Sequence, residues 1–276
     1  MRTKRRSWLG ALLLAGALAL PLAAPVPAAA DVRGTDVILG QTVEARGLPA
    51  VACPNITASY AVLTDENGAV LFARDADTQS HIASITKVMT AIVALDSGLP
   101  LDTKVTVSPE AAAVGESSAN LQAGDTLTLQ AALTGLMVPS GNDAAIAIAE
   151  AVGAGLARDG QSANEAFVDA MNAKAAELGM EHSLFANPHG LDIDEFDNEM
   201  YSTAGDVALM CAYAMENETF RSIVAQQTAQ ITVAKPDGQA VTLDLVSSDL
   251  LLGVYEGACG IKTGYTSKAG NCLAST

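Results

Sequence analysis

The run His81-Ile-Ala-Ser84-Ile-Thr-Lys87-Val-Met-Thr-Ala91 places a serine and a lysine three residues apart at the start of an apolar helix. Side chains at positions i and i+3 share one helix face, so the hydroxyl and the amine are expected to meet one turn apart. A serine hydroxyl becomes an effective nucleophile when a neighbouring base takes its proton, and a partly desolvated lysine amine can do this. A chain of this length contains about one such S-x-x-K run by chance, so the motif needs support from elsewhere.

That support lies far downstream, in Ser140-Gly141-Asn142 and Lys262-Thr263-Gly264. Ser140 follows Ser84 by 56 residues, and Lys262 follows Ser140 by 122 residues. Each of these motifs also has a simpler interpretation. Asn142 can cap the helix that follows it, and Lys262 can be a solvated lysine on a strand.

The three motifs, in this order, resemble those of the serine-type D-alanyl-D-alanine carboxypeptidases, the low-molecular-mass penicillin-binding proteins related to serine β-lactamases. The resemblance covers roughly residues 52–276. It implies an α+β, β-lactamase/transpeptidase-like fold, in which helices and a helical subdomain flank an antiparallel sheet. The stretches that carry the resemblance are Ala83-Ser-Ile-Thr-Lys-Val-Met-Thr-Ala91, Ser140-Gly-Asn-Asp-Ala-Ala145, Phe185-Ala-Asn-Pro-His-Gly-Leu191, Tyr201-Ser-Thr-Ala-Gly-Asp206 and Gly260-Ile-Lys-Thr-Gly-Tyr-Thr266.

The resemblance also implies a mechanism. Ser84 attacks the carbonyl between the two terminal D-alanines of a peptidoglycan stem peptide, and Lys87 acts as its base. Ser140 relays a proton to the leaving amine, and β-lactam antibiotics acylate the same serine. The backbone N–H groups of Ser84 and Tyr265 form the oxyanion hole. The implied substrate-binding residues are Asn142, Lys262, Thr263 and Gly264.

A secreted serine β-lactamase is the nearest alternative function, and a non-enzymatic or catalytically impaired penicillin-binding protein is another. Class A β-lactamases usually carry S-D-N and a deacylating glutamate on a loop, whereas this chain has S-G-N and no Glu-x-x-Leu-Asn stretch after it. His189, in the turn Asn187-Pro-His-Gly190, receives no catalytic role. No Cys/His spacing predicts a metal site, and no cofactor is expected.

The N-terminus is typical of a secretory signal peptide, because four basic residues precede the apolar run Trp8 to Leu20 and Ala28-Ala29-Ala30 follows. Cleavage is expected before Asp31, so that the exported protein acts at the extracellular face of the cell membrane, in the cell wall or in the periplasm. No other membrane anchor is expected in this chain. Without residues 1–30 the formal net charge becomes −20 instead of −16, which argues against nucleic acid as a partner.

Residues 31–276 are expected to form one α+β domain, truncated at the C-terminus, in which strands from both ends of the chain share a sheet that is incomplete there. Residues 31–58 carry no clear pattern and are expected to be irregular. Two hairpins are predicted, around Asp65 to Gly68 and around Pro236 to Gly238. The predicted helices begin near Ser84, Thr128, Asp143, Asn164 and Val207.

The four cysteines could form two disulfides in an exported protein, but the residues assign no pairing. Cys211 shares an apolar stripe with Met210 and is expected to be a buried thiol. If the turn before the last strand centres on Ser267-Lys268, Cys272 lies opposite Thr263 and not opposite Cys259.

Overall fold

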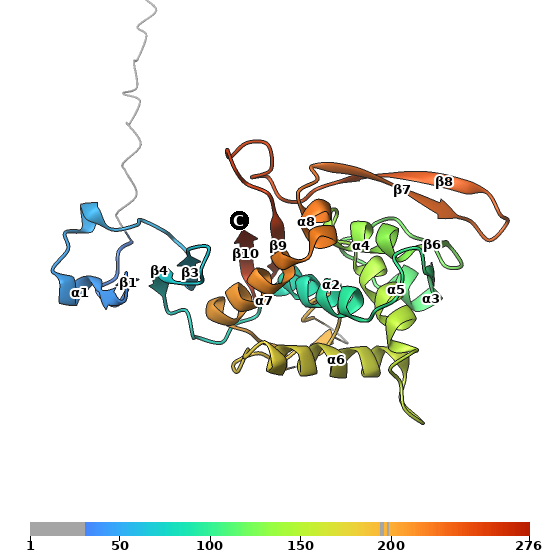
Figure 1. The fold of residues 1–276 in the computed structure, drawn as a ribbon, viewed down its shortest axis with the longest axis horizontal. Helices are drawn as coiled ribbons and strands as arrows, with labels where there is room; N and C mark the ends of the chain where they lie inside the picture. Colours follow the sequence, from blue (N-terminus) through green and yellow to red (C-terminus); the bar gives the residue numbers. More distant parts are fainter. Residues whose placement is uncertain (1–30, 194–195, 198) are drawn as a thin grey trace, which may run out of the picture.

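The computed structural model describes residues 31–193, 196–197 and 199–276, and the predicted signal peptide lies outside these ranges. The fold is α+β, with antiparallel strands at both ends of the chain and helices in the middle, as the sequence predicts (Figure 1). The first sheet has the order β2-β1-β4-β3. Its strands are β1 (Val37–Ile38), β2 (Gln41–Thr42), β3 (Ala61–Thr64) and β4 (Val70–Arg74).

The predicted hairpin around Asp65 to Gly68 is confirmed, since β3 and β4 pair antiparallel across it. Asp65 Oδ1 accepts hydrogen bonds from the backbone N–H groups of Asn67 and Ala69, and Gly68 has a φ of +80°. An aspartate that closes a turn on its own backbone and a glycine with positive φ are both favourable in this position.

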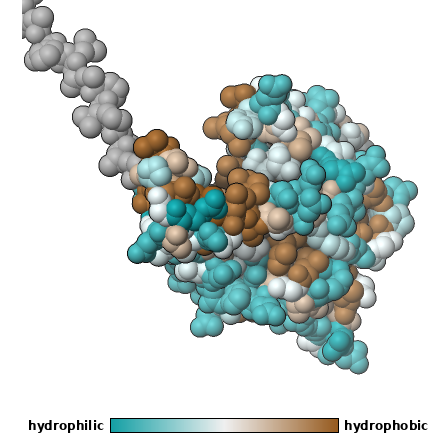
Figure 2. All heavy atoms as spheres, turned by 60° about the vertical axis from the view of Figure 1, so that its left-hand side comes forward, coloured by the Kyte–Doolittle hydropathy of each residue, from teal (hydrophilic) through white to brown (hydrophobic). Residues whose placement is uncertain are grey.

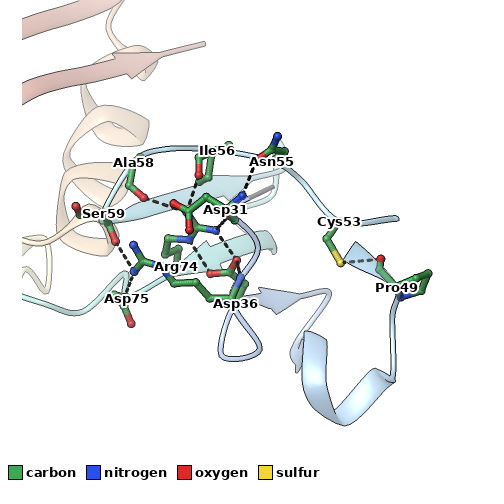
Figure 3. Close-up of polar contacts among 11 residues, drawn as sticks. Asp31, Asp36, Pro49, Cys53, Asn55, Ile56, Ala58, Ser59, Arg74 and Asp75 are labelled. Carbon is green, nitrogen blue, oxygen red and sulfur yellow. Dashed lines mark hydrogen bonds and ion pairs between the residues drawn. The ribbon is translucent and has the colours of Figure 1, made fainter. Parts of the chain in front are cut away.

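The expectation that residues 31–58 are irregular is wrong. They form β1, β2, the short helix α1 (Val43–Arg46) and the 3-10 turn η1 (Ala50–Ala52). The cause is a contact outside the segment: Arg74 on β4 donates to the Asp36 carboxylate, the Asp31 carboxylate and three backbone carbonyls (Figure 3). These carbonyls belong to Asp31, Ile56 and Ala58.

The helical middle of the chain surrounds α2 (Lys87–Asp96), whose residues from Lys87 to Ala94 are all buried. A helix that is apolar on every side belongs in a core, and α4, α5, α6 and α7 pack around it. Three of these helices begin within a few residues of the predicted positions. Hydroxyl side chains at Thr128, Ser162 and Thr203 cap their N-termini. The remaining helices are α3 (Pro109–Ala113), α4 (Leu129–Met137), α5 (Asn142–Gly153), α6 (Ala163–Glu177), α7 (Ala204–Glu216) and α8 (Glu218–Val224).

A second sheet has the order β5-β6-β7-β8. Its last two strands are the predicted second hairpin, which projects from the helices in Figure 1. The strands are β5 (Lys104–Thr106), β6 (Thr126–Thr128), β7 (Thr228–Ala234) and β8 (Ala240–Val246).

The last two strands, β9 (Ile261–Thr266) and β10 (Gly270–Ser275), pair only with each other among the described residues. The expectation that they share a sheet with the N-terminal strands is therefore wrong. Strands of one sheet lie about 4.8 Å apart, whereas β3 and β10 have no bridge between them and each packs against α7.

The predicted register of these two strands is wrong by one residue, because Cys272 lies opposite Gly264 and not opposite Thr263. Thr266 pairs with Gly270, which leaves a three-residue loop in place of a two-residue turn. Gly270 has a φ of +68°, the left-handed conformation that commonly ends such loops. All four cysteines are free, and Cys211 is buried as predicted.

Apolar side chains gather on the surface where the N-terminal sheet meets the rest of the molecule (Figure 2). Leu63 on β3, Leu209 on α7 and Leu273 on β10 are each about half exposed, at 57%, 48% and 56%. Within the described ranges, no helix combines the length and the apolar character that a membrane span requires.

Candidate active site

Ser84 lies in the 3-10 turn η2 (Ala83–Thr86), immediately before α2, and not in the first turn of the α-helix itself. Its hydroxyl is 2.8 Å from Lys87 Nζ, so the predicted meeting of the two side chains is confirmed. Ala83 has a φ of +47°, an uncommon conformation for a residue with a side chain. Such backbone strain is often found beside reactive groups, where it presents a side chain in a fixed direction.

Lys87 is fully buried, and its ammonium group has few partners. Besides Ser84, Nζ donates to the backbone carbonyl of His189 at 2.8 Å. Burial lowers the pKa of Lys87 well below its usual range, and the nearby charge of Lys262 lowers this pKa further. The charge of Asp143 acts in the opposite direction and is the smallest of these three effects on the pKa. The amine is therefore suited to accept a proton near neutral pH.

The Ser140-Gly141-Asn142 turn connects α4 to α5. Ser140 is 5% exposed and has a φ of +68°. Asn142 does not cap α5, because the capping position is Gly141, where no side-chain hydrogen bond is made. Asn142 Nδ2 instead donates to the Gly115 carbonyl, and the buried Oδ1 has no hydrogen-bond partner in the described part of the chain.

Lys262 is 1% exposed, so its interpretation as a solvated strand lysine is wrong. Burial lowers the pKa of Lys262 to about 7, while the charge of Asp249 acts in the opposite direction. Its Nζ donates to the Thr263 carbonyl at 2.7 Å. The Thr263 hydroxyl lies 2.6 Å from the hydroxyl of Ser248, which belongs to the loop between β8 and β9.

Strand β9 packs directly against the turn that carries Ser84. A side chain at Gly264 would place its Cβ 2.9 Å from the Ser84 backbone nitrogen, so glycine permits this close approach. Ser84, Lys87, Lys262 and Gly264 thus come together. The Ser140 side chain makes no hydrogen bond to these residues in the described part of the chain, but the charge of Asp143, three residues further on, influences the pKa of Lys87.

The comparisons agree with this geometry. A family model described as D-alanyl-D-alanine carboxypeptidase matches residues 48–276. The chain is 35% identical over 255 residues to the D-alanyl-D-alanine carboxypeptidase of Streptomyces sp. strain K15, covering 89% of this chain and 85% of that protein. The chain belongs to the D-alanyl-D-alanine carboxypeptidase family.

Two further comparisons, one with a crystal structure and one with a longer relative, give the extent of the similarity. The crystal structure of the Streptomyces K15 DD-transpeptidase has a TM-score of 0.73 and 33% identity, covering 80% of this chain and 85% of that one. D-alanyl-D-alanine carboxypeptidase DacF of Bacillus subtilis strain 168 is 33% identical over 224 residues. Those residues are 79% of this chain but 54% of DacF, so the chain spans about half of that relative.

Sequence patterns did not identify every group at this carboxypeptidase-like site. The Asn187-Pro-His-Gly190 turn supplies the carbonyl that holds Lys87, while burial lowers the pKa of the His189 ring to about 3 and keeps it neutral. Ser248 and Asp249 lie in a loop without a recognised motif. A buried aspartate, Asp192, was also missed, because one acidic residue after a turn resembles any solvated loop residue.

Proposed function

We propose that this chain is a serine peptidase that removes the terminal D-alanine from peptidoglycan stem peptides ending in D-Ala-D-Ala. The observation that carries the proposal is the 2.8 Å contact between Ser84 Oγ and the buried Lys87 Nζ. The proposal also places the protein outside the cytoplasm, at the extracellular face of the membrane, in the cell wall or in the periplasm, because this substrate is found there.

In the first step Ser84 Oγ attacks the carbonyl carbon between the two D-alanines, and its proton passes to Lys87 Nζ. The carbonyl oxygen becomes an oxyanion, which accepts hydrogen bonds from the backbone N–H groups of Ser84 and Tyr265. The close packing of Gly264 on the Ser84 turn supports this role, since it brings the two segments within reach of one oxygen atom.

In the second step the carbon–nitrogen bond breaks and an ester forms on Ser84. The leaving amine takes a proton through the Ser140 hydroxyl, and D-alanine departs. Water then hydrolyses the ester and restores the free serine. A β-lactam follows the same first step, but its opened ring stays attached to Ser84.

The terminal carboxylate binds to Lys262 and the Thr263 hydroxyl. Lys262 and Thr263 precede Gly264 and Tyr265 on β9. The same strand therefore holds the terminal carboxylate and the scissile carbonyl of the substrate. Asn142 contributes its side-chain amide to holding the substrate backbone.

A fluorescent penicillin and a D-Ala-D-Ala peptide test this function together. We expect the chain to be labelled on one peptide containing Ser84 and to release D-alanine, and we expect Ser84→Ala to abolish both. Ser222→Ala, which removes an exposed hydroxyl that donates only to the Thr219 carbonyl, is the matched control and should behave as wild type.

Labelling that persists in Ser84→Ala would exclude Ser84 as the nucleophile. Rapid and sustained hydrolysis of nitrocefin would instead favour a β-lactamase. Stoichiometric labelling without any release of D-alanine would indicate a penicillin-binding protein that is catalytically impaired.

A further inference from the structure

Asp192 connects two segments that border the proposed oxyanion hole. Its side chain is 0% exposed and lies in the loop that follows Asn187-Pro-His-Gly190. Asp192 Oδ2 accepts a hydrogen bond from Thr266 Oγ1 at 2.9 Å. It also lies 3.2 Å from His81 Nδ1, which is close enough for an ion pair with a protonated imidazole but is not a hydrogen bond in the described part of the chain. Thr266 directly follows Tyr265 on β9, and His81 precedes Ser84 by three residues. One carboxylate therefore contacts both sides of the site.

The same loop is also fastened to the nucleophile turn and to the base. The absent Cβ of Gly190 would lie 2.0 Å from the Ala83 carbonyl oxygen, so the loop and the turn are in direct contact. The backbone carbonyl of His189, the residue before Gly190, accepts a hydrogen bond from Lys87 Nζ. These backbone contacts fix the position of Asp192 relative to Ser84. The hydrogen bond from Thr266 to Asp192 then fixes β9 relative to the same loop.

The burial of Asp192 is costly if the residue serves packing alone. Its Oδ1 atom is buried and has no hydrogen-bond partner among the residues that the structure describes. A buried carboxylate with an unpartnered oxygen stabilises a fold less than a well-packed apolar side chain of similar size. The presence of a buried carboxylate at this position is explained if Asp192 helps to fix the geometry of the site.

We propose that Asp192 is a positioning residue that sets the separation of the two oxyanion N–H donors, by tying Thr266 on β9 to His81 ahead of Ser84. This inference rests on the proposed function, since it requires that Ser84 is acylated. Donors held in place before the reaction stabilise an oxyanion more than donors that must first move into position.

The test is the rate constant for acylation by a fluorescent penicillin, together with kcat and KM for a D-Ala-D-Ala peptide. We expect Asp192→Ala to lower the acylation rate constant and kcat about 10- to 100-fold and to leave KM within about threefold of wild type. Thr266→Val removes the donor to Asp192 and should cause a similar loss. The double variant should lose little more than either single one, because both remove the same contact.

Two further variants separate positioning from stability. Asp192→Asn keeps an acceptor for Thr266 and should recover most of the rate. Asp125→Ala is the matched control, because Asp125 is also 0% exposed, is also paired with one basic side chain, Lys235, and also has one unpartnered oxygen. It should lower the melting temperature but not the rate per folded molecule.

A folded Asp192→Ala or Thr266→Val protein that is acylated at the wild-type rate would overturn the inference. Equal losses of rate in Asp125→Ala and Asp192→Ala would also overturn it, because the effect would then be one of general stability. If the wild-type chain is not labelled at Ser84, the proposed function itself is overturned. This outcome is distinct from failure of the Asp192 inference, because it is measured on the wild-type chain and does not involve any Asp192 variant.

Discussion

Arg74 and Lys87 are both buried basic side chains, but their surroundings are opposite in kind. Both side chains are shielded from solvent. Arg74 is met by the carboxylates of Asp31 and Asp36 and by three backbone carbonyls (Figure 3). Lys87 Nζ donates hydrogen bonds to the Ser84 hydroxyl and the His189 carbonyl, and the charge of a second lysine, Lys262, lies nearby.

This difference separates a structural charge from a reactive amine. The hydrogen bond to Asp36 raises the pKa of Arg74, so its charge is permanent. Burial and a neighbouring cation lower the pKa of Lys87, so its proton is easily lost. A buried cation with complete partners holds chain segments together, whereas a buried amine that forms no ion pair with a carboxylate can act as a base.

The comparison predicts its largest effect at Lys87. We expect Lys87→Met to lower the rate of acylation about 10³-fold, because the base is lost, and to leave the free energy of unfolding unchanged or raised, because a poorly paired buried amine is removed. Penicillin labelling and urea unfolding measure the two effects. Lys104→Met, at an exposed position on β5, is the control and should change neither. A Lys87→Met protein that is labelled at the wild-type rate would exclude the lysine base.

Arg74→Met should show the reverse pattern. Removing the guanidinium leaves the Asp36 carboxylate buried and unpaired, which we expect to lower the free energy of unfolding by about 3–5 kcal/mol. The rate of acylation per folded molecule should not change. Arg33→Met breaks the exposed pair with Asp75 and should cost less than about 1 kcal/mol. Equal destabilisation by the Arg33 and Arg74 variants would show that burial does not matter here.

Lys262 is the intermediate case, since burial lowers its pKa to about 7 while the charge of Asp249 acts in the opposite direction. Below this pKa the amine is protonated and attracts a carboxylate, and above it the attraction is lost. KM for a D-Ala-D-Ala peptide should therefore rise about tenfold between roughly pH 6 and pH 8. KM for the corresponding C-terminal amide, which has no carboxylate, should stay nearly constant. A KM that is independent of pH for both peptides would contradict the assigned role of Lys262.

Local patterns predicted the elements that local forces stabilise. In the structure, helix α6 begins with a capping box between Ser162 and Glu165, and the hairpin after β3 closes on the turn at Asp65, so each is stabilised by residues close in sequence. Ser84 and Lys87 are three residues apart, so their contact is nearly independent of the rest of the fold. Elements whose partners are distant were predicted poorly: β1 and β2 depend on Arg74, which is 38 residues beyond Asp36.

The sequence by itself determined which chemical groups the site contains, because the motifs that begin at Ser84, Ser140 and Lys262 supply serine hydroxyls and two lysine amines. Only the tertiary structure decided how those groups behave. The carbonyl that holds Lys87 comes from a residue 102 positions away. The carboxylate of Asp192 reaches Thr266 across 74 positions. Desolvation and hydrogen bonds of this kind exist only after distant segments have packed together, and no local pattern encodes their strength.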